Sequence, residues 1–216
     1  MNLQNIKTIF ISPCTSKYTY KCFEMKHYLT THKFKWELHK SELIYPLGLT
    51  IAFQEILLQN LNDEPLLILE DDARLQKIIY QLENIPSDAD AVYLGISAVG
   101  NGHFPFNSAS VEPYENVYKI NSMRSAHAIL YLTRRYKLAI ANAIQGKICD
   151  IEMANVQHKF NVYGFDNPIF IQNGTDINAM LTKTTMRKIY MERKITVLFC
   201  MILSYYIILK LWKFII

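Results

Sequence analysis

Three consecutive acidic residues, Glu70, Asp71 and Asp72, directly follow an uncharged aliphatic run at residues 66–69. Like charges placed side by side repel one another, so such a cluster is costly unless a cation or turn donors compensate it. Carboxylate oxygens suit Mg²⁺ and Mn²⁺, and such ions complete their coordination with water and substrate phosphate. The acids therefore predict a metal–diphosphate site. The alternative is a polar turn with an N-cap acid before a helix that begins near Arg74, which explains one acid better than three.

A second acidic pair, Asp150 and Glu152, lies at the start of a predicted helix at residues 149–159. A carboxylate at this place could act as a general base that removes the proton of an attacking hydroxyl. An acid in a first helical turn also stabilises the helix by about 0.3–1 kcal/mol through the helix dipole, which requires no catalytic role. The residues alone weigh these two explanations evenly.

Strand and helix patterns alternate along the chain, and they predict an α/β fold with a mixed, mainly parallel sheet flanked by helices. Ligands in such sheets bind outside the carboxyl ends of the strands, where the three acids stand. Residues 97–113 predict a long loop, and loops of that length are more often functional than idle. The predicted strands are residues 6–12, 34–38, 66–69, 91–94, 117–120, 126–132, 162–163 and 169–171; the predicted helices are residues 18–31, 49–61, 74–85, 133–145 and 149–159.

The composition is that of a globular protein with a basic terminal segment. Of the 216 residues, 50% are hydrophobic, and seven glycines and seven prolines leave no low-complexity stretch, which excludes disordered and collagen-like chains. The segment from Lys183 onward holds seven basic residues and one acid, so it carries a net charge of +6 and the preceding body −2. An acidic body lacks the basic face that nucleic-acid binding requires, so we expect no nucleic-acid partner.

The basic segment at residues 183–194 precedes a strongly apolar terminus at residues 195–216. Counted to its end, this terminus is long enough to cross a bilayer, with Trp212 and two terminal lysines at the far interface. We therefore expect a catalytic domain at residues 1–182, a basic linker at 183–194 and a membrane anchor at 195–216. The alternatives for the anchor are a buried last helix and an amphipathic helix lying in the membrane plane.

The side of the membrane follows from two further patterns. The basic residues before the apolar terminus favour a cytosolic body by the positive-inside rule. The first apolar run, at residues 8–12, is too short for a secretory signal. The four cysteines form no C-x-x-C pair and fit a reducing compartment, so we expect neither a zinc site nor disulfides.

Four segments in sequence carry a resemblance to a known family. The stretch LLILEDDARL, followed by AVYLG, resembles the metal and nucleotide-sugar segment of GT-A glycosyltransferases. The likeness is strongest to the family of lipooligosaccharide galactosyltransferases (family 25) and to related domains of large DNA viruses. The stretches RSAHAILYLTRRYKLAI, CDIEMA and PIFIQNGTDI resemble later segments of that family in the same order, so the resemblance covers most of residues 8–177.

The resemblance implies a glycosyltransferase that uses a nucleotide-sugar, with a UDP-sugar favoured, and that acts on a glycan, glycolipid or glycoprotein acceptor. Asp72, with Asp71, would bind Mn²⁺ or Mg²⁺ at the donor diphosphate, and Glu70 or Asp71 would contact the ribose or a metal-bound water. The metal would stabilise the leaving nucleoside diphosphate. We expect an inverting reaction in which Asp150 or Glu152 is the base.

Three further groups of residues are weaker candidates. Ser12 and Thr15 could contact the nucleotide base or ribose, although capping of the following helix explains them better. The turn at residues 172–176 could face the diphosphate, with Asn173 or Asp176 near the metal, although a tight glycine turn explains it slightly better. Arg124 and His127 could contact a phosphate or the acceptor, although a buried histidine is commonly structural, and Arg134 and Arg135 predict a solvated helix face.

Two other functions compete with glycosyl transfer. The first is a metal-dependent phosphotransferase with a nucleophilic aspartate at a strand end. That class normally has Asp-x-Asp followed by a hydroxyl residue, whereas this chain reads Glu-Asp-Asp-Ala-Arg. The second is a non-catalytic, tail-anchored scaffold whose acids form a surface patch.

Overall fold

The computed structural model of the protein describes the chain except residues 14–18, 42–44, 77–78, 102–107, 173–184 and 216. Its main element is an eight-stranded sheet with the order β2-β1-β3-β8-β5-β9-β7-β6. A two-stranded sheet pairs β10 with β4. The strands are β1 (Lys7–Ser12), β2 (Lys35–Lys40), β3 (Leu66–Glu70), β4 (Ala73–Leu75), β5 (Ala91–Tyr93), β6 (Ser110–Tyr114), β7 (Val117–Ser122), β8 (Ala128–Tyr131), β9 (Val162–Gly164) and β10 (Phe170–Gln172).

The sheet is mixed, as the sequence predicts. β1 pairs in parallel with both β2 and β3, and β5 pairs in parallel with β9. β8 lies antiparallel between β3 and β5, so β3 and β5 point the same way and their carboxyl ends share one edge of the sheet. The acids that follow β3 therefore stand at the edge where ligands bind in α/β sheets.

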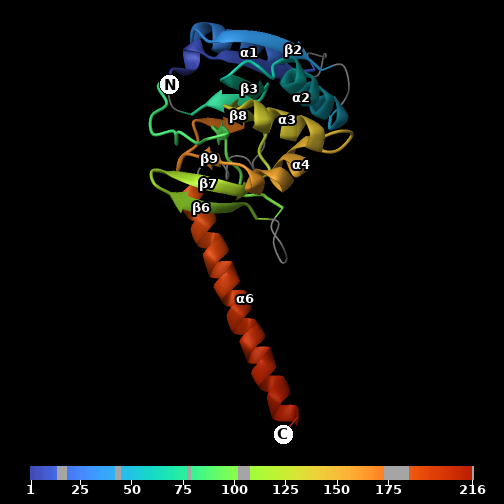
Figure 1. The fold of residues 1–216 in the computed structure, drawn as a ribbon, viewed down its shortest axis with the longest axis vertical. Coiled ribbons are helices and arrows are strands. Elements are labelled where there is room, and N and C mark those ends of the chain that lie inside the picture. The colour runs from blue at the N-terminus through green and yellow to red at the C-terminus, as the bar shows by residue number, and fades with distance from the viewer. Residues whose placement is uncertain (14–18, 42–44, 77–78, 102–107, 173–184, 216) are drawn as a thin grey trace.

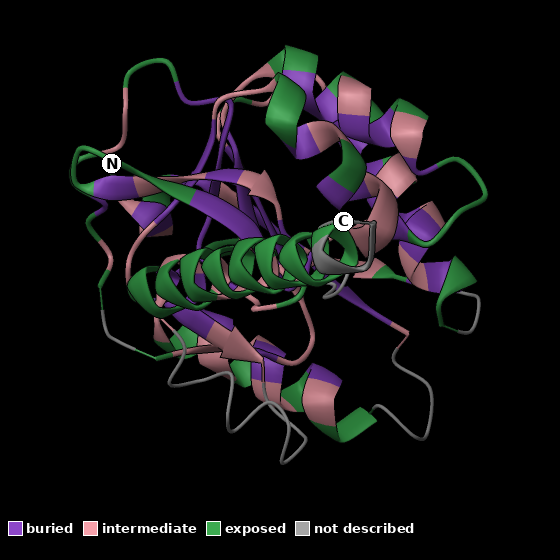
Figure 2. Cartoon of the chain, turned by 90° about the horizontal axis from the view of Figure 1, so that it is seen from below, coloured by how far each residue is buried: buried purple, intermediate pink, exposed green. Residues whose placement is uncertain are grey.

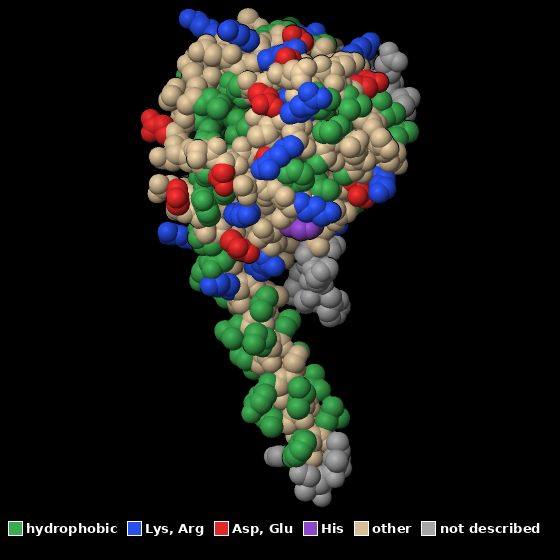
Figure 3. All heavy atoms as spheres, viewed as in Figure 1, with side chains coloured by type: hydrophobic (Ala, Val, Ile, Leu, Met, Phe, Trp, Pro, Cys, Tyr) green, Lys and Arg blue, Asp and Glu red, His purple; other side chains and the backbone are tan. Residues whose placement is uncertain are grey.

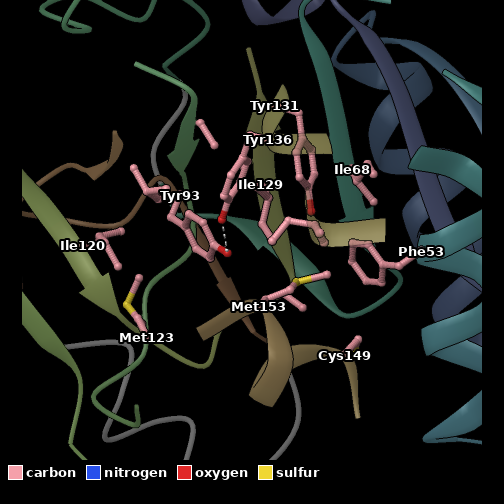
Figure 4. Packing of buried hydrophobic residues seen from close by; sticks show 14 of the residues in the cluster. Phe53, Ile68, Tyr93, Ile120, Met123, Ile129, Tyr131, Tyr136, Cys149 and Met153 are labelled. Carbon is pink, nitrogen blue, oxygen red and sulfur yellow. Dashed lines mark hydrogen bonds between the residues drawn. The ribbon is translucent and has the colours of Figure 1, made fainter. Parts of the chain in front are cut away.

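Helices cover both faces of this sheet, which gives three layers (Figure 1). Ile9, Ile11 and Ile68 face α2, α3 and α4, whereas Phe10 and Leu67 face α1. This alternation follows from the two-residue period of a strand. Figure 4 shows the packing between the sheet and α2, α3 and α4. There the hydroxyls of Tyr93 and Tyr136 lie 3.4 Å apart. The helices are α1 (Thr19–Thr31), α2 (Leu47–Gln59), α3 (Arg134–Ala143), α4 (Cys149–Val156) and α6 (Met186–Ile215), with short 3-10 turns η1 (Leu3–Asn5) and η2 (Gln157–Lys159).

The helix predicted for residues 74–85 is wrong. Residues 73–75 form β4, and the segment after it runs beside the amino terminus, where Leu3 N donates to Tyr80 O and Leu82 N donates to Met1 O, both over 2.7 Å. These long-range hydrogen bonds satisfy the backbone in an extended conformation, so the helical spacing of the apolar residues does not decide the structure. The loop predicted at residues 97–113 is also shorter, because its last part is β6 at the edge of the sheet.

The solvated helix face predicted for Arg134 and Arg135 is confirmed, since both are exposed, but Arg135, whose side chain is 64% exposed, also pairs with a buried acid. Its Nε and Nη2 donate to the two carboxylate oxygens of Asp90 over 2.5 and 2.7 Å, and the Asp90 side chain is fully buried. Burial would raise the pKa of Asp90, but hydrogen bonds from Arg135, Thr133 and the amide of Asn161 hold it below its ordinary value. The pair joins α3 to the start of β5 and to the chain before β9.

The helix α6 projects from the body as a single stem (Figures 1 and 2). Met186 and Ile189 in its first turns are buried in the core, whereas the side chains described from Val197 onward are mostly exposed and apolar, as the space-filling view shows (Figure 3). Residues Met186–Trp212 are long and apolar enough to cross a membrane. The helix begins inside the segment expected as a basic linker, and Arg193 donates a hydrogen bond to Ser110 of β6.

The cysteines differ from the expectation. Cys149 and Cys200 are free thiols, but Cys22 on α1 is disulfide-bonded. The expectation of no disulfides is therefore wrong for Cys22.

Candidate functional site

The site is built around the end of β3, the central strand between β1 and β8. Glu70 pairs with Ile11 of β1, and its amide donates to the carbonyl of His127 over 3.0 Å just before β8 begins. The backbone of Glu70 is thus fixed on both sides by neighbouring strands. This places the three carboxylates at one defined point of the sheet edge.

The carboxylate of Asp71 points back to the first strand. Ser12 Oγ, at the end of β1, donates to Asp71 Oδ2 over 2.6 Å, and the Ser12 side chain is fully buried. Burial raises the pKa of Asp71, while the Ser12 hydrogen bond and the positive charges of Lys21 and Arg74 oppose this effect. Ser12, predicted as a ligand-binding residue, therefore holds a predicted metal ligand in place.

Among the described residues, the carboxylate of Asp72 has one satisfied oxygen and one orphaned oxygen. Its Oδ2 lies 3.7 Å from Lys21 Nζ and accepts from Gln172 Nε2 over 3.3 Å. Its Oδ1 is buried and has no hydrogen-bonding partner within the described part of the chain. Burial raises the pKa of Asp72, and the charge of Lys21 opposes this rise. A buried carboxylate oxygen without a donor is the kind of group that a cation would satisfy.

Glu70 is the most perturbed of the three acids. Burial raises the pKa of its carboxyl well above the ordinary value, and the negative charges of Asp72, Asp71 and Asp150 raise it further. Lys21 opposes the rise. Desolvation and like-charge repulsion therefore both favour a proton, or a bound cation, at this point.

The positive charges around the acids come from Lys21 on α1 and Arg74 on β4, and no local sequence pattern predicts their positions. Arg74 Nη1 donates to the carbonyls of Asp71 and Ala73 over 2.9 Å each, and its Nη2 donates to Glu24 Oε2 over 2.8 Å. Lys21 and Glu24 lie three residues apart on α1, so they share one face of the helix. Only the tertiary fold brings that face to the end of β3.

The carboxylates fit a divalent metal of the kind the sequence predicts. No group of three His, Cys, Asp or Glu side chains converges on a common metal position among the described residues. A Mg²⁺ or Mn²⁺ ion does not need one, because it is commonly held by one or two carboxylates together with water and substrate phosphates. Asp71 and Asp72, with the orphaned oxygen of Asp72, supply that donor set.

A pocket opens beside the acids and separates the two candidate bases. Asp150, at the start of α4, lines it together with Glu70, whereas Glu152 lies outside this lining and its carboxylate is 3.7 Å from Lys147 Nζ. The structure therefore brings Asp150, and not Glu152, to the acidic centre. The described part of the pocket has a volume of about 130 Å³, less than the roughly 300 Å³ of the smallest common ligand pockets, so it accommodates only part of a nucleotide-sugar. Its polar lining includes Tyr45, Glu70, Ser97, Arg124, His127 and Asp150.

His127 lines the same pocket as a neutral side chain. It is 5% exposed, burial lowers its pKa to about 4, and its Nδ1 lies 3.2 Å from Ser125 Oγ. The imidazole lies against Gly95, where a Cβ would come within 2.0 Å of His127 Nε2, so only glycine fits there. The predicted alternative of a buried, structural histidine agrees with this packing.

The remaining candidates are not placed by the structure. Thr15 and the predicted turn residues Asn173 and Asp176 lie outside the described residues. The strand before that turn is described, and Gln172 at its end pairs with Ala73. The closing strand therefore lies beside the acidic motif.

Comparison with solved structures finds similar folds at low sequence identity. A197 from STIV matches with a TM-score of 0.50 and 13% identity over 79% of this chain and 86% of that chain. A glycosyltransferase involved in the glycosylation of the major capsid of PBCV-1 matches with a TM-score of 0.45 and 12% identity over 71% and 76% of the two chains. The CTP:phosphocholine cytidylyltransferase LicC from Streptococcus pneumoniae matches with a TM-score of 0.42 and 8% identity over 82% of this chain and 98% of that chain. At these identities the likeness concerns the fold alone. No protein-family model and no curated protein matches the sequence.

The raised pKa of Glu70 predicts a stabilising substitution. When the pKa of a carboxyl is higher in the folded than in the unfolded protein, the folded protein loses stability as the pH rises from the unfolded pKa, about 4.3, towards the folded pKa. Glu70→Gln should therefore raise the melting temperature at pH 7.5 by about 2–4 °C, the shift that about 1 kcal/mol produces in a chain of this size. The gain should vanish near pH 4. The measurement is thermal unfolding by circular dichroism in detergent micelles with EDTA.

The matched control for this prediction is Glu152→Gln, which removes a carboxylate that pairs with Lys147 outside the pocket. It should not stabilise the protein at pH 7.5. A lower melting temperature for Glu70→Gln at pH 7.5 would contradict the prediction, because it would mean that ionised Glu70 is compensated without a metal.

Proposed function

We propose that the protein is a metal-dependent glycosyltransferase that moves a sugar from a nucleotide-sugar, with a UDP-sugar favoured, to a glycan, glycolipid or glycoprotein acceptor. The observation that supports it best is the orphaned, buried Oδ1 of Asp72 within a cluster of raised-pKa carboxylates. This cluster lies at the edge of the sheet where ligands bind in α/β folds. Beside it is a pocket that Glu70 and Asp150 both line. The resemblance of the acidic segment to GT-A glycosyltransferases of family 25 supports the same activity.

In this proposal Asp71 and Asp72 hold Mn²⁺ or Mg²⁺ at the donor diphosphate. The bound ion supplies Lewis-acid stabilisation of the negative charge on the leaving group. The protein fixes both carboxylates in advance, because Ser12 holds Asp71 and the pair of Lys21 and Gln172 holds Asp72. Glu70 faces the pocket and contacts the donor ribose or a metal-bound water.

Asp150 acts as the general base of an inverting transfer. It takes the proton of the acceptor hydroxyl while that oxygen forms a bond to the anomeric carbon, and the bond from that carbon to the diphosphate breaks. Asp150 Oδ1 accepts from the amide of Ile151 over 2.9 Å, which orients the carboxylate and leaves its other oxygen for the acceptor. Glu152 stabilises the first turn of α4 and its contact with Lys147.

The first test is nucleotide binding and donor hydrolysis by the full chain in detergent micelles. A panel of nucleotide-sugars with Mn²⁺ should give nucleoside diphosphate release with a UDP-sugar. Calorimetry should show UDP binding that requires the metal. Asp72→Asn should lower turnover by at least about 100-fold, because transition-state charge stabilisation of this kind is worth several kcal/mol. Its melting temperature should not fall, because the substitution also removes charge repulsion.

The control for Asp72→Asn is Asp63→Asn. Asp63 lies before the start of β3, at the end of the strand away from the acids, and pairs with Lys7. This variant should keep full turnover. A folded wild-type protein that binds no nucleotide at any metal concentration would reject the proposal and favour the non-catalytic scaffold. Phosphoryl transfer from the nucleotide without sugar release would favour the phosphotransferase.

A second experiment assigns the base. Asp150→Asn should lose at least about 100-fold in kcat while the affinity for UDP and Mn²⁺ changes little, because general-base catalysis contributes roughly 10²–10⁴-fold. Glu152→Gln should keep kcat within about threefold, since its side chain lies outside the pocket lining. The reverse result, with Glu152→Gln inactive and Asp150→Asn active, would refute the assignment.

We also propose that α6 anchors the protein in a membrane, because its described side chains past the body are exposed and apolar. The full chain should float with liposomes after alkaline extraction. The double variant Phe199→Lys and Ile202→Lys should not, because each lysine near the centre of a spanning helix costs about 2.5–3.5 kcal/mol. Leu58→Lys with Ile79→Lys, on the body, should float like the wild type. Equal flotation of both double variants would contradict a spanning helix.

A further inference from the structure

The acidic centre is served by two cations that already have partners. Lys21 Nζ lies 3.7 Å from Asp72 Oδ2. Arg74 donates to Glu24 and to two backbone carbonyls. A nucleoside diphosphate is itself an anion, so its approach to the carboxylates of Glu70 and Asp150 needs a further positive charge.

Arg124 is a third cation at this site and lies in the wall of the pocket. It lines the same cavity as Glu70 and Asp150. Its amide donates to Val99 O over 2.8 Å, and its Nε donates to Asn101 Oδ1 over 2.5 Å. These bonds fix the backbone and the inner edge of the guanidinium.

Asn101 is itself held from two directions, which makes this support rigid. Its amide donates to Ser122 Oγ at the end of β7 over 2.9 Å. Its Nδ2 donates to Ile151 O over 2.6 Å and to Asn155 Oδ1 over 2.7 Å, both on α4. Because α4 also carries Asp150, Asn101 couples the position of Arg124 to that of the proposed base.

The outer edge of the guanidinium has no partner within the described part of the chain. Among the described residues no carboxylate lies within ion-pair distance of Arg124, and no acceptor receives its two Nη groups. A guanidinium presents its Nη donors as a planar fork that matches two oxygens of a phosphate. An arginine that is fixed at Nε, with both Nη atoms unpaired among the residues that the structure describes, is thus oriented to bind an anionic ligand.

We propose that Arg124 is a substrate-binding residue that grips the diphosphate of the donor, with Asn101 as its positioning residue. This inference rests on the proposed function, and it identifies the group that offsets the negative charge of the pocket. In this arrangement the diphosphate would contact the guanidinium as well as the ion held by Asp71 and Asp72. Arg124 then also stabilises the charge that the diphosphate gains as it leaves.

The test compares ligands that differ only in their phosphates. The full chain in detergent micelles with Mn²⁺ is titrated with UDP, GDP and CDP, and the corresponding nucleoside is measured by competition. Arg124→Met should weaken binding of the preferred diphosphate by about 10- to 100-fold, the range of 1.5–3 kcal/mol for charged hydrogen bonds. Binding of the nucleoside should stay within twofold of wild type, because it carries no phosphate.

Two further variants test separately the planar donor geometry of the Arg124 guanidinium and its positioning by Asn101. Arg124→Lys keeps the charge but loses the fork, so its diphosphate affinity should fall between those of wild type and Arg124→Met. Asn101→Ala should raise KM for the donor with a smaller effect on kcat. Arg134→Met is the control, because Arg134 contacts Asn62 on the surface and should bind UDP like wild type.

The outcomes are distinct. Equal diphosphate affinity in Arg124→Met and wild type overturns this inference and leaves the proposed function intact. Equal losses for nucleoside and diphosphate also overturn it, because they show that Arg124 only supports the pocket. If the folded wild type binds no diphosphate at all, the proposed function fails and the inference fails with it.

Discussion

The repulsion among Glu70, Asp71 and Asp72 is the constraint around which this end of the molecule is organised. Three carboxylates at the end of a buried strand are desolvated and close to one another, and the pKa of each is raised. The fold compensates this only in part. Ser12 and Lys21 each satisfy one carboxylate oxygen, and one oxygen of Asp72 has no donor among the described residues.

This incomplete compensation is informative because the protein solves a similar problem fully elsewhere. The buried carboxylate of Asp90 receives two bonds from Arg135, one from Thr133 and one from the amide of Asn161, and its pKa is lowered. A structural acid in this fold is therefore saturated with donors. The acids after β3 are not, which is the pattern expected where a bound cation completes the site. On this comparison we regard the cluster as functional and the Asp90 network as structural.

Much of the fold could be predicted from the sequence, because local hydrophobic patterns indicate most strands and helices of the body. The aliphatic run before Glu70 and the helical spacing at residues 49–61 both correspond to observed elements, β3 and α2. The helix predicted at residues 74–85 fails because of long-range contacts that no local pattern indicates. Residues 73–75 are extended because they pair with β10, and Tyr80 and Leu82 form backbone hydrogen bonds with the amino terminus.

The candidate site likewise contains residues that the sequence indicates and residues that only the tertiary fold brings together. The acids themselves are visible in the sequence as an unusual run, but their counter-charges on α1 carry no local signal. The choice between Asp150 and Glu152 likewise depended on the orientation of α4, since residues two apart on a helix point in different directions. Asn101 and Arg124 are 23 residues apart in the sequence, and no spacing rule predicts a contact over that separation.

Under the proposed membrane anchoring, the direct passage of α6 from the core into its exposed stem would set the distance between the pocket and the lipid surface. Met186 and Ile189 are packed inside the body, so no slack tether separates the sheet from the stem. At 1.5 Å per residue the 30 residues extend about 45 Å, more than the thickness of a hydrocarbon layer near 30 Å. With the stem inserted, the pocket would be carried at a nearly constant height above the lipid surface. Acceptors held at that height would meet it at high local concentration, and those standing farther out would be beyond its reach.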